Sequence, residues 1–167
     1  RADLYKKMYP KCKMICGDIT SSHVFKKLEN EIGKHNIDFL IATPPCQGVS
    51  LAGKNKSLEQ MTTDDRNQLI LKAIEIIKIA NPKVILIENV PRYKNLYLSY
   101  NSELHTVEDI LKKELKNYTL KVEVISATDF GVPQKRERVI FRLYKRDVNW
   151  ELPKKEKEIT LREAIEH

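Results

Sequence analysis

Apolar residues recur along this sequence in two spacings that predict different secondary structures. Repeats of three and four positions predict amphipathic helices, and short continuous apolar runs predict buried strands. Helices are predicted over residues 4–8, 22–33, 64–80, 103–117 (with Ser102 as its cap) and 160–166. Strands are predicted over residues 13–16, 37–42, 84–87, 120–125 and 139–144, with an irregular connection over residues 93–101.

The alternation of strands and helices predicts an α/β fold with a doubly wound, mostly parallel sheet and helices on both faces. A loop over residues 128–138, with Gly131 and Pro133, separates the last two strands and predicts a C-terminal antiparallel hairpin. We expect residues 1–148 to form the core domain. Residues 149–167 are expected to form a linker and a short helix.

Three of the predicted strands end in polar or reactive residues. Asp18 follows the first strand and Cys46 follows the second. Glu88 and Asn89 follow the third. The carboxyl ends of parallel strands share one edge of the sheet, where open α/β proteins bind their ligands. These strand ends therefore predict a functional site at that edge.

The Cys46 thiol is the candidate nucleophile. Pro44 and Pro45 stiffen the chain before it, because each fixes φ and neither can donate to a strand ladder. Gly48 allows a sharp bend soon after it. A buried, inert thiol is the alternative, since free cysteines are commonly buried. The rigid position at a strand end favours a nucleophile.

The two carboxylates at the strand ends have a structural and a functional interpretation each. Glu88 follows four apolar strand residues, so we expect it to be partly buried and able to hold a proton; a surface acid is the alternative. Asp18 is either a helix-capping acid or an acceptor for a hydrogen bond from a nucleotide-like ligand.

A charged stretch over residues 134–138 precedes the last strand. If it is extended, Gln134, Arg136 and Arg138 share one face. An amide and two guanidiniums suit phosphate or carbonyl oxygens. A solvated run of charges is the alternative.

The overall charge favours a polyanionic partner. Lysine and arginine total 30 against 23 acidic residues, a net charge of +7, which suits nucleic acid, although lysine-rich surfaces also simply solubilise. Three cysteines, an odd number, argue against a disulfide framework and for a reducing compartment. Cys12 and Cys16 lack a second pair at metal-binding spacing, so no metal site is predicted.

Five motifs together resemble the catalytic core of DNA cytosine-5 methyltransferases. They stand in the order of that family, with 42 positions from Cys46 to Glu88 and 50 from Glu88 to Arg138. The motifs are Gly17-Asp18-Ile19-Thr20, Pro45-Cys46-Gln47-Gly48-Val49-Ser50, Asp65-Arg66 with Leu69, Glu88-Asn89-Val90, and residues 130–139.

The resemblance implies methyl transfer to C5 of a cytosine that is flipped out of double-stranded DNA. Cys46 would add to C6 of the base, and Glu88 would engage N3 and the exocyclic amine. Arg138 would contact the base O2, and Arg136 would support the site. The implied setting is a restriction-modification system in the bacterial cytoplasm.

The resemblance also implies a cofactor and a loop that faces DNA. The cofactor is S-adenosyl-L-methionine, and the residues expected to bind it are Asp18, Ile19, Pro45 and Leu69. The residues expected to contact DNA are Gln47, Ser50, Lys54 and Gln134. The polar stretch over residues 51–63 is a candidate lid.

Two elements of the family pattern are absent from this sequence. Its five glycines include no G-x-G turn of the kind that holds the methionine part of the cofactor, and no target-recognition region follows the last motif. We therefore expect an incomplete core, either a piece of a longer enzyme or one subunit of a split enzyme that has a complementary segment.

Two rival functions stay open at this point. The first is a non-catalytic nucleic-acid-binding module, which the positive charge favours. The second is a different thiol enzyme, such as an acyl-transfer hydrolase. That enzyme would need a histidine base beside Cys46, and none of the four histidines stands at a predicted strand end.

We predict that the chain alone binds S-adenosylmethionine weakly and transfers methyl groups slowly or not at all, because the glycine turn is absent. Isothermal titration calorimetry of the chain with the cofactor measures the affinity. A binding isotherm that fits micromolar affinity would contradict the prediction.

Overall fold

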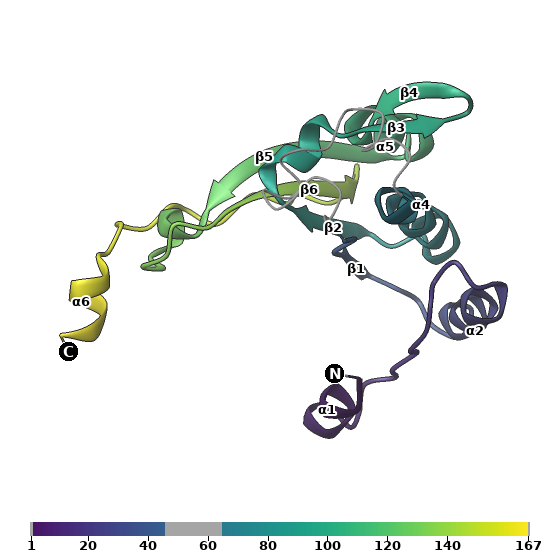
Figure 1. Cartoon of the computed structure of the whole chain (residues 1–167), viewed down its shortest axis with the longest axis horizontal. Coiled ribbons are helices and arrows are strands. Elements are labelled where there is room, and N and C mark those ends of the chain that lie inside the picture. The colour runs from purple at the N-terminus through teal and green to yellow at the C-terminus, as the bar shows by residue number, and fades with distance from the viewer. Residues whose placement is uncertain (1, 46–64, 167) are drawn as a thin grey trace.

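The centre of the molecule is a four-stranded sheet in the order β1-β2-β6-β5 (Figure 1). The computed structural model describes residues 2–45 and 65–166. The strands are β1 (Phe39–Ala42), β2 (Val84–Asn89), β5 (Tyr118–Ser126) and β6 (Glu137–Lys145). β1 pairs with β2 in parallel, and β6 is antiparallel to both β2 and β5. Three strands thus run one way and β6 the other, which confirms the α/β fold with a C-terminal antiparallel hairpin.

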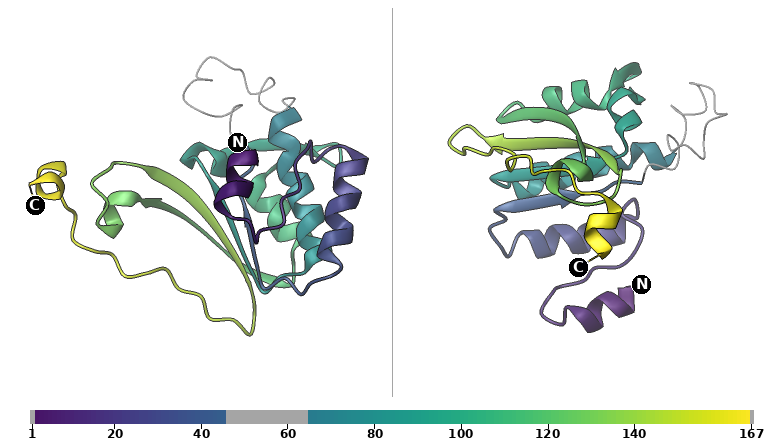
Figure 2. Two further views of the ribbon diagram at one scale, coloured as in Figure 1. Left: turned by 90° about the horizontal axis from the view of Figure 1, so that it is seen from below. Right: turned by 90° about the vertical axis from the view of Figure 1, so that its left-hand side faces the viewer.

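The helices that complete the core lie on one face of this sheet (Figure 2). They are α4 (Leu69–Ala80) and α5 (Val107–Glu114), with α2 (Ser22–Ile32) beside α4. The other helices are α1 (Ala2–Met8), α6 (Leu161–Ile165) and the 3-10 turns η2 (Asp65–Gln68), η3 (Pro91–Asn95) and η4 (Ala127–Phe130). Among the described helices, none has the length and apolar character that crossing a bilayer requires.

The hydrophobic core lies between α4, α5 and the covered face of the sheet. Ile85 and Ile87 of β2 and Phe141 of β6 are fully buried. They share this face because side chains alternate along a strand and Ile87 pairs with Phe141 across the ladder. Ile74 and Ile77 of α4 pack against them from the helix side of the sheet, as the helical spacing predicts.

The opposite face of β1 is much less covered. Phe39 is 50% exposed and Ile41 is 61% exposed. Helices were expected on both faces, but in the described part of the chain this face is lined by the segment that follows β6. Trp150 of that segment meets Phe39 edge to face, with ring centroids 6.2 Å apart.

A buried arginine anchors the segment after β6 to the sheet. Arg142 is 4% exposed and makes two hydrogen bonds with the Glu123 carboxylate, from Nε at 2.9 Å and from Nη2 at 3.0 Å. Its Nη1 donates to the Trp150 carbonyl at 2.6 Å. The expected linker therefore begins as an irregular segment tethered to the sheet, and it ends in α6, which Thr160 caps as predicted.

The region between β2 and α5 differs from the prediction, which was an irregular connection over residues 93–101 followed by a long helix over residues 103–117. Strands β3 (Tyr97–Tyr100) and β4 (Glu103–Thr106) form an antiparallel hairpin, and Leu104, which lies within the predicted helix, is 61% exposed in β4. Ser102 lies in the turn with φ +67° and does not cap the helix. The cap is Thr106. The prediction was wrong because the helical spacing of apolar residues was extended back over Glu103–Thr106, which pairs with β3 as strand β4.

The strand predicted over residues 13–16 is not formed. These residues carry no ladder pairing in the described chain, although Met14 and Ile15 are half-buried. A short apolar run becomes a strand only when a neighbouring strand supplies backbone partners. β1, the strand at that side of the sheet, pairs only with β2 among the described residues.

Replacing Thr106 with Ala is expected to lower the free energy of unfolding by about 1 kcal/mol, because the Thr106 hydroxyl caps α5. Thr106 Oγ1 accepts a hydrogen bond from the Asp109 N–H at 3.1 Å. Urea denaturation followed by circular dichroism measures the change. Ser21→Ala is the matched control, since Ser21 precedes α2 without a side-chain capping bond. An equal loss in both variants would contradict the assignment.

Candidate active site

The candidate site lies at the edge of the sheet where β1 and β2 end and β6 begins (Figure 1). Because β6 is antiparallel to β2, its first residues lie beside the last residues of β2. Glu88 pairs with Ile140 and Asn89 pairs with Val139. Strand ends that are far apart in the sequence are thus neighbours here.

Glu88 and Arg138 form an ion pair at this edge. Arg138 Nε lies 2.6 Å from Glu88 Oε1, and the two side chains are 25% and 30% exposed, respectively. Arg138 Nη1 also donates to the backbone carbonyl of Glu137 at 2.7 Å. Glu88 is partly buried, as expected from the apolar strand before it. The pair presents an acceptor and several donors side by side, which suits a heterocycle that carries both kinds of group.

A second contact at this edge involves Asn89, to which the sequence assigned no role of its own. Asn89 is 3% exposed. Its Nδ2 donates to the Pro44 carbonyl at 2.9 Å, and its Oδ1 accepts from the Val90 N–H at 2.9 Å. The available signal was the alternation along β2, which puts Asn89 on the same face as the buried Ile85 and Ile87.

Several predicted site residues fall outside the part of the chain that the structure describes. They are Cys46, Gln47, Ser50, Lys54 and the candidate lid over residues 51–63. Their roles stay predictions.

The expected shared face of Gln134, Arg136 and Arg138 is not formed, because β6 begins only at Glu137. Gln134 lies in a turn in which its N–H donates to the Val132 carbonyl at 2.7 Å. The Arg136 carbonyl accepts from the Ala127 N–H at 3.0 Å and closes the loop. Both side chains are exposed, whereas Arg138 lies on the strand and reaches Glu88.

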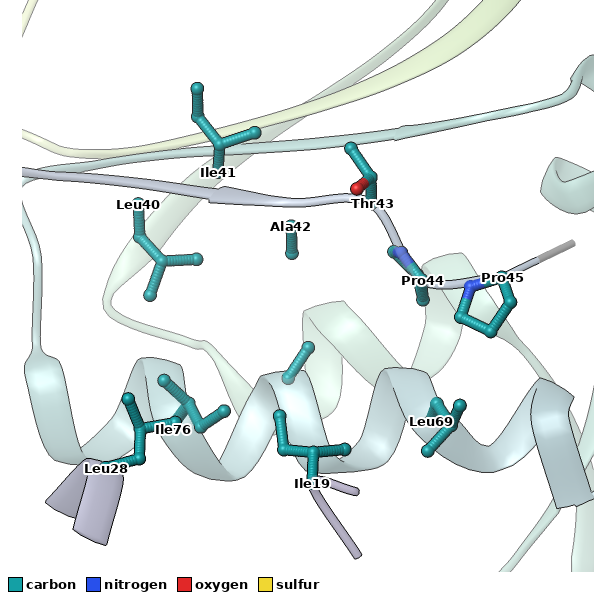
Figure 3. Close-up of a pocket in the computed structure, with 11 residues that line it drawn as sticks. Ile19, Leu28, Leu40, Ile41, Ala42, Thr43, Pro44, Pro45, Leu69 and Ile76 are labelled. Atoms are coloured by element: carbon teal, nitrogen blue, oxygen red, sulfur yellow. The ribbon is translucent and has the colours of Figure 1, made fainter. Parts of the chain in front are cut away.

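An apolar pocket of about 370 Å³ opens between β1, α4 and the segment that leads into α2 (Figure 3). Ile19, Pro45 and Leu69 line it, so three of the four residues expected to hold the cofactor share one cavity. Leu40 and Ala42 of β1 form its opposite wall. A flat aromatic group such as a purine suits these walls, because they offer apolar surface and few hydrogen-bonding groups.

Asp18, the fourth expected cofactor residue, precedes Ile19 but is not among the residues that line the pocket. Its carboxylate accepts from the Thr20 N–H at 2.9 Å and from the Thr20 hydroxyl at 2.7 Å. These bonds, the backbone one first, lower the pKa of Asp18. An ionised acceptor therefore stands in solvent next to the pocket.

Comparison with protein families and with curated proteins gives consistent results. A family model described as C-5 cytosine-specific DNA methylase matches residues 1–166. The chain is 43% identical over 166 residues to the Type II methyltransferase M1.HgaI of Avibacterium volantium, covering 99% of this chain and 46% of that protein. It is 33% identical over 139 residues to M1.HphI of Haemophilus parahaemolyticus, covering 83% of this chain and 36% of that protein. The chain therefore spans about a third to a half of the relatives it matches.

Solved structures share the fold over nearly the whole chain. The Entamoeba histolytica methyltransferase EhMeth superposes with a TM-score of 0.67 at 24% identity, covering 95% of this chain and 46% of that one. Spodoptera frugiperda DNMT2 superposes with a TM-score of 0.59 at 23% identity, covering 95% and 43%. These similarities support the arrangement of strands and helices.

Replacing Thr20 with Val is expected to raise the pKa of Asp18, because the hydroxyl that stabilises the ionised carboxylate is lost. The pKa should stay below the ordinary value of 3.8, since the hydrogen bond from the Thr20 N–H, the larger cause of the lowering, remains. The stabilisation is present above the ordinary pKa and is lost as the pH falls through the folded-state pKa.

Carbon-detected NMR titration of the carboxyl groups measures this shift. Asp129, whose pKa Lys155 lowers, is the internal control and should not move. An Asp18 titration midpoint that is the same in both proteins would refute the role of the hydroxyl.

Proposed function

Because the chain belongs to the family of C-5 cytosine-specific DNA methylases, we propose that it forms the catalytic core of a DNA cytosine-5 methyltransferase. The reaction transfers a methyl group to C5 of a cytosine that has been flipped out of double-stranded DNA. The observation that carries the proposal is the meeting of Glu88 and Arg138, at 2.6 Å, beside the strand end that leads into Cys46.

The chemistry follows from the residue types at this edge. The Cys46 thiolate forms a bond to C6 of the cytosine, and the electron pair displaced from the ring double bond makes C5 nucleophilic. The Glu88 carboxyl binds N3 and the exocyclic amine and so stabilises the charge that develops in the ring. After methyl transfer, loss of the C5 proton restores the double bond and expels Cys46.

Arg138 is proposed to donate to the base O2, with Arg136 as a supporting positive charge. In the described structure the Arg138 guanidinium contacts Glu88 directly, so a pyrimidine ring enters between them only after the pair separates. Both side chains have several rotatable bonds and are a quarter or more exposed. The ion pair can therefore open without movement of the strands, and the base replaces each lost partner with one of its own polar groups.

The apolar pocket fits the cofactor that the family implies. Ile19, Pro45 and Leu69 would hold the adenine of S-adenosyl-L-methionine, and Asp18 would accept a hydrogen bond from its amine. The bound cofactor supplies an electrophilic methyl group. The apolar walls would exclude water from the adenine, and the Asp18 carboxylate would help to orient it.

Double-stranded DNA is the proposed partner of the basic surface. The net charge of +7 supports binding to phosphates, with affinity that falls as salt rises. Gln47, Ser50, Lys54 and Gln134 are proposed to contact the DNA. The bacterial origin and Type II names of the relatives support a restriction-modification role in the cytoplasm.

We also propose that a complementary methyltransferase segment, in the same polypeptide or in a second subunit, adds to the free edge of β1. Among the described strands, β1 pairs only with β2, and its Phe39 and Ile41 are at least half exposed. An apolar edge strand is a template for a further strand. The added segment would supply the missing glycine turn beside the pocket. Residues 149–167 are proposed as the linker towards a target-recognition region.

Duplex DNA that contains 5-fluorocytosine tests the reaction, because fluorine at C5 blocks the final release and traps the covalent adduct. We expect mass spectrometry to find an adduct on Cys46 when a longer protein that contains this chain is mixed with this DNA and the cofactor. Cys46→Ser should abolish the adduct. Cys12→Ser, the matched control at an exposed thiol, should keep it.

Glu88→Gln should slow adduct formation by about a hundredfold, the typical loss when a positioned acid–base group is removed. Absence of any adduct in the longer protein would refute the proposal. DNA binding that is unchanged in Cys46→Ser, with no adduct in the parent, would instead support the non-catalytic nucleic-acid-binding module.

A further inference from the structure

The end of β1 and the end of β2 are joined by one buried side-chain hydrogen bond beyond their ladder. The parallel ladder stops at the pair of Ala42 with Ile87. Two residues further on, the Pro44 carbonyl accepts from Asn89 Nδ2 at 2.9 Å, across 45 positions of sequence. The bond thus connects the tip of one strand to the residue directly after Glu88.

Few other backbone hydrogen bonds can hold the Pro44–Pro45 segment against β2. Pro44 and Pro45 have no N–H, so neither can extend the ladder with β2. β1 is also an edge strand of only four residues in the described sheet. Carbonyl acceptance is therefore the main hydrogen bond that the proline turn can make with β2.

Both polar ends of the Asn89 amide have hydrogen-bond partners. At 3% exposure, both ends of its amide would be costly to leave unpaired. Nδ2 is satisfied by Pro44, and Oδ1 accepts from the Val90 N–H at 2.9 Å. With both ends of the amide engaged and the side chain buried, its conformation is restricted, and it holds the Pro44 carbonyl at a fixed distance from β2.

We propose that Asn89 is a positioning residue that fixes the Pro44–Pro45 turn relative to Glu88. The inference rests on the proposed function, in which Cys46 follows Pro45 and acts with Glu88 on the same base. Asn89 does not touch the base in this scheme. It sets the place from which the nucleophile-bearing segment starts and the position of Pro45 in the wall of the cofactor pocket.

Asn89→Asp isolates the bond. The variant keeps the shape of the side chain and an acceptor for the Val90 N–H, but it has no Nδ2 donor and turns a carboxylate oxygen toward the Pro44 carbonyl. Asn117→Asp is the matched control, because it makes the same chemical change at an exposed position. Asn89→Leu, which is neutral and of similar volume, replaces Asn89→Asp if that protein does not fold.

Peptide-resolved hydrogen exchange of the purified chain is the first measurement. We expect residues 39–43 to exchange about tenfold faster in Asn89→Asp, as the loss of one hydrogen bond predicts, while β5 exchanges as in the parent. Equal acceleration of both segments would indicate a merely structural role. No acceleration at residues 39–43 would also overturn the proposal.

The second measurement separates positioning from binding in the protein that forms the 5-fluorocytosine adduct. We expect Asn89→Asp to slow adduct formation at saturating DNA by about tenfold with unchanged DNA affinity, and Asn117→Asp to change neither. Weaker DNA binding at a normal adduct rate would overturn the inference. If the parent forms no adduct, the proposed function fails, and the hydrogen-exchange result still decides whether Asn89 anchors the turn.

Discussion

The antiparallel insertion of β6 between β2 and β5 is the constraint on which the site depends. β6 pairs with β5 along its whole length and with β2 over residues 139–144, so its register is fixed from two sides. A shift of one residue would turn Phe141 out of the core and Arg138 away from Glu88 together. The burial of Phe141, at 0% exposed, thus selects the register that also brings the guanidinium to the carboxylate. Core packing and site geometry are settled by the same hydrogen-bond ladder.

The two sides of the site edge serve different chemical needs. On the side of α4, Pro45 lines the apolar pocket, and the buried Asn89 side chain bonds the Pro44 carbonyl beside β2. At the Glu88–Arg138 pair, the polar groups are partly exposed and can exchange their mutual contact for contacts with a bound base. The two sides of this edge therefore present different surfaces, an apolar pocket on one and partly exposed polar groups on the other. β1 pairs only with β2 among the described strands, so its other edge has no ladder partner there.

The differences from the sequence predictions have a common cause. Periodicity identified α4, β2 and β6, whose apolar residues have partners in the core. It failed for residues 13–16, which have no strand beside them in the described chain, and for Leu104, which lies in β4 because the helix begins only at Val107. Alternation predicted that Gln134 and Arg136 share a face with Arg138. Side chains alternate regularly only within a strand, and β6 begins at Glu137, after both residues.

The sequence by itself determined the α/β class, the order of the motifs and the residue types that identify the family, because local spacing and motif chemistry are written along the chain. Tertiary structure decided which side chains meet. The contact of Arg138 with Glu88 and the bond from Asn89 to Pro44 join segments 50 and 45 positions apart. Such contacts follow from strand order and register, which are set by the packing of the whole sheet and are not encoded in any one segment.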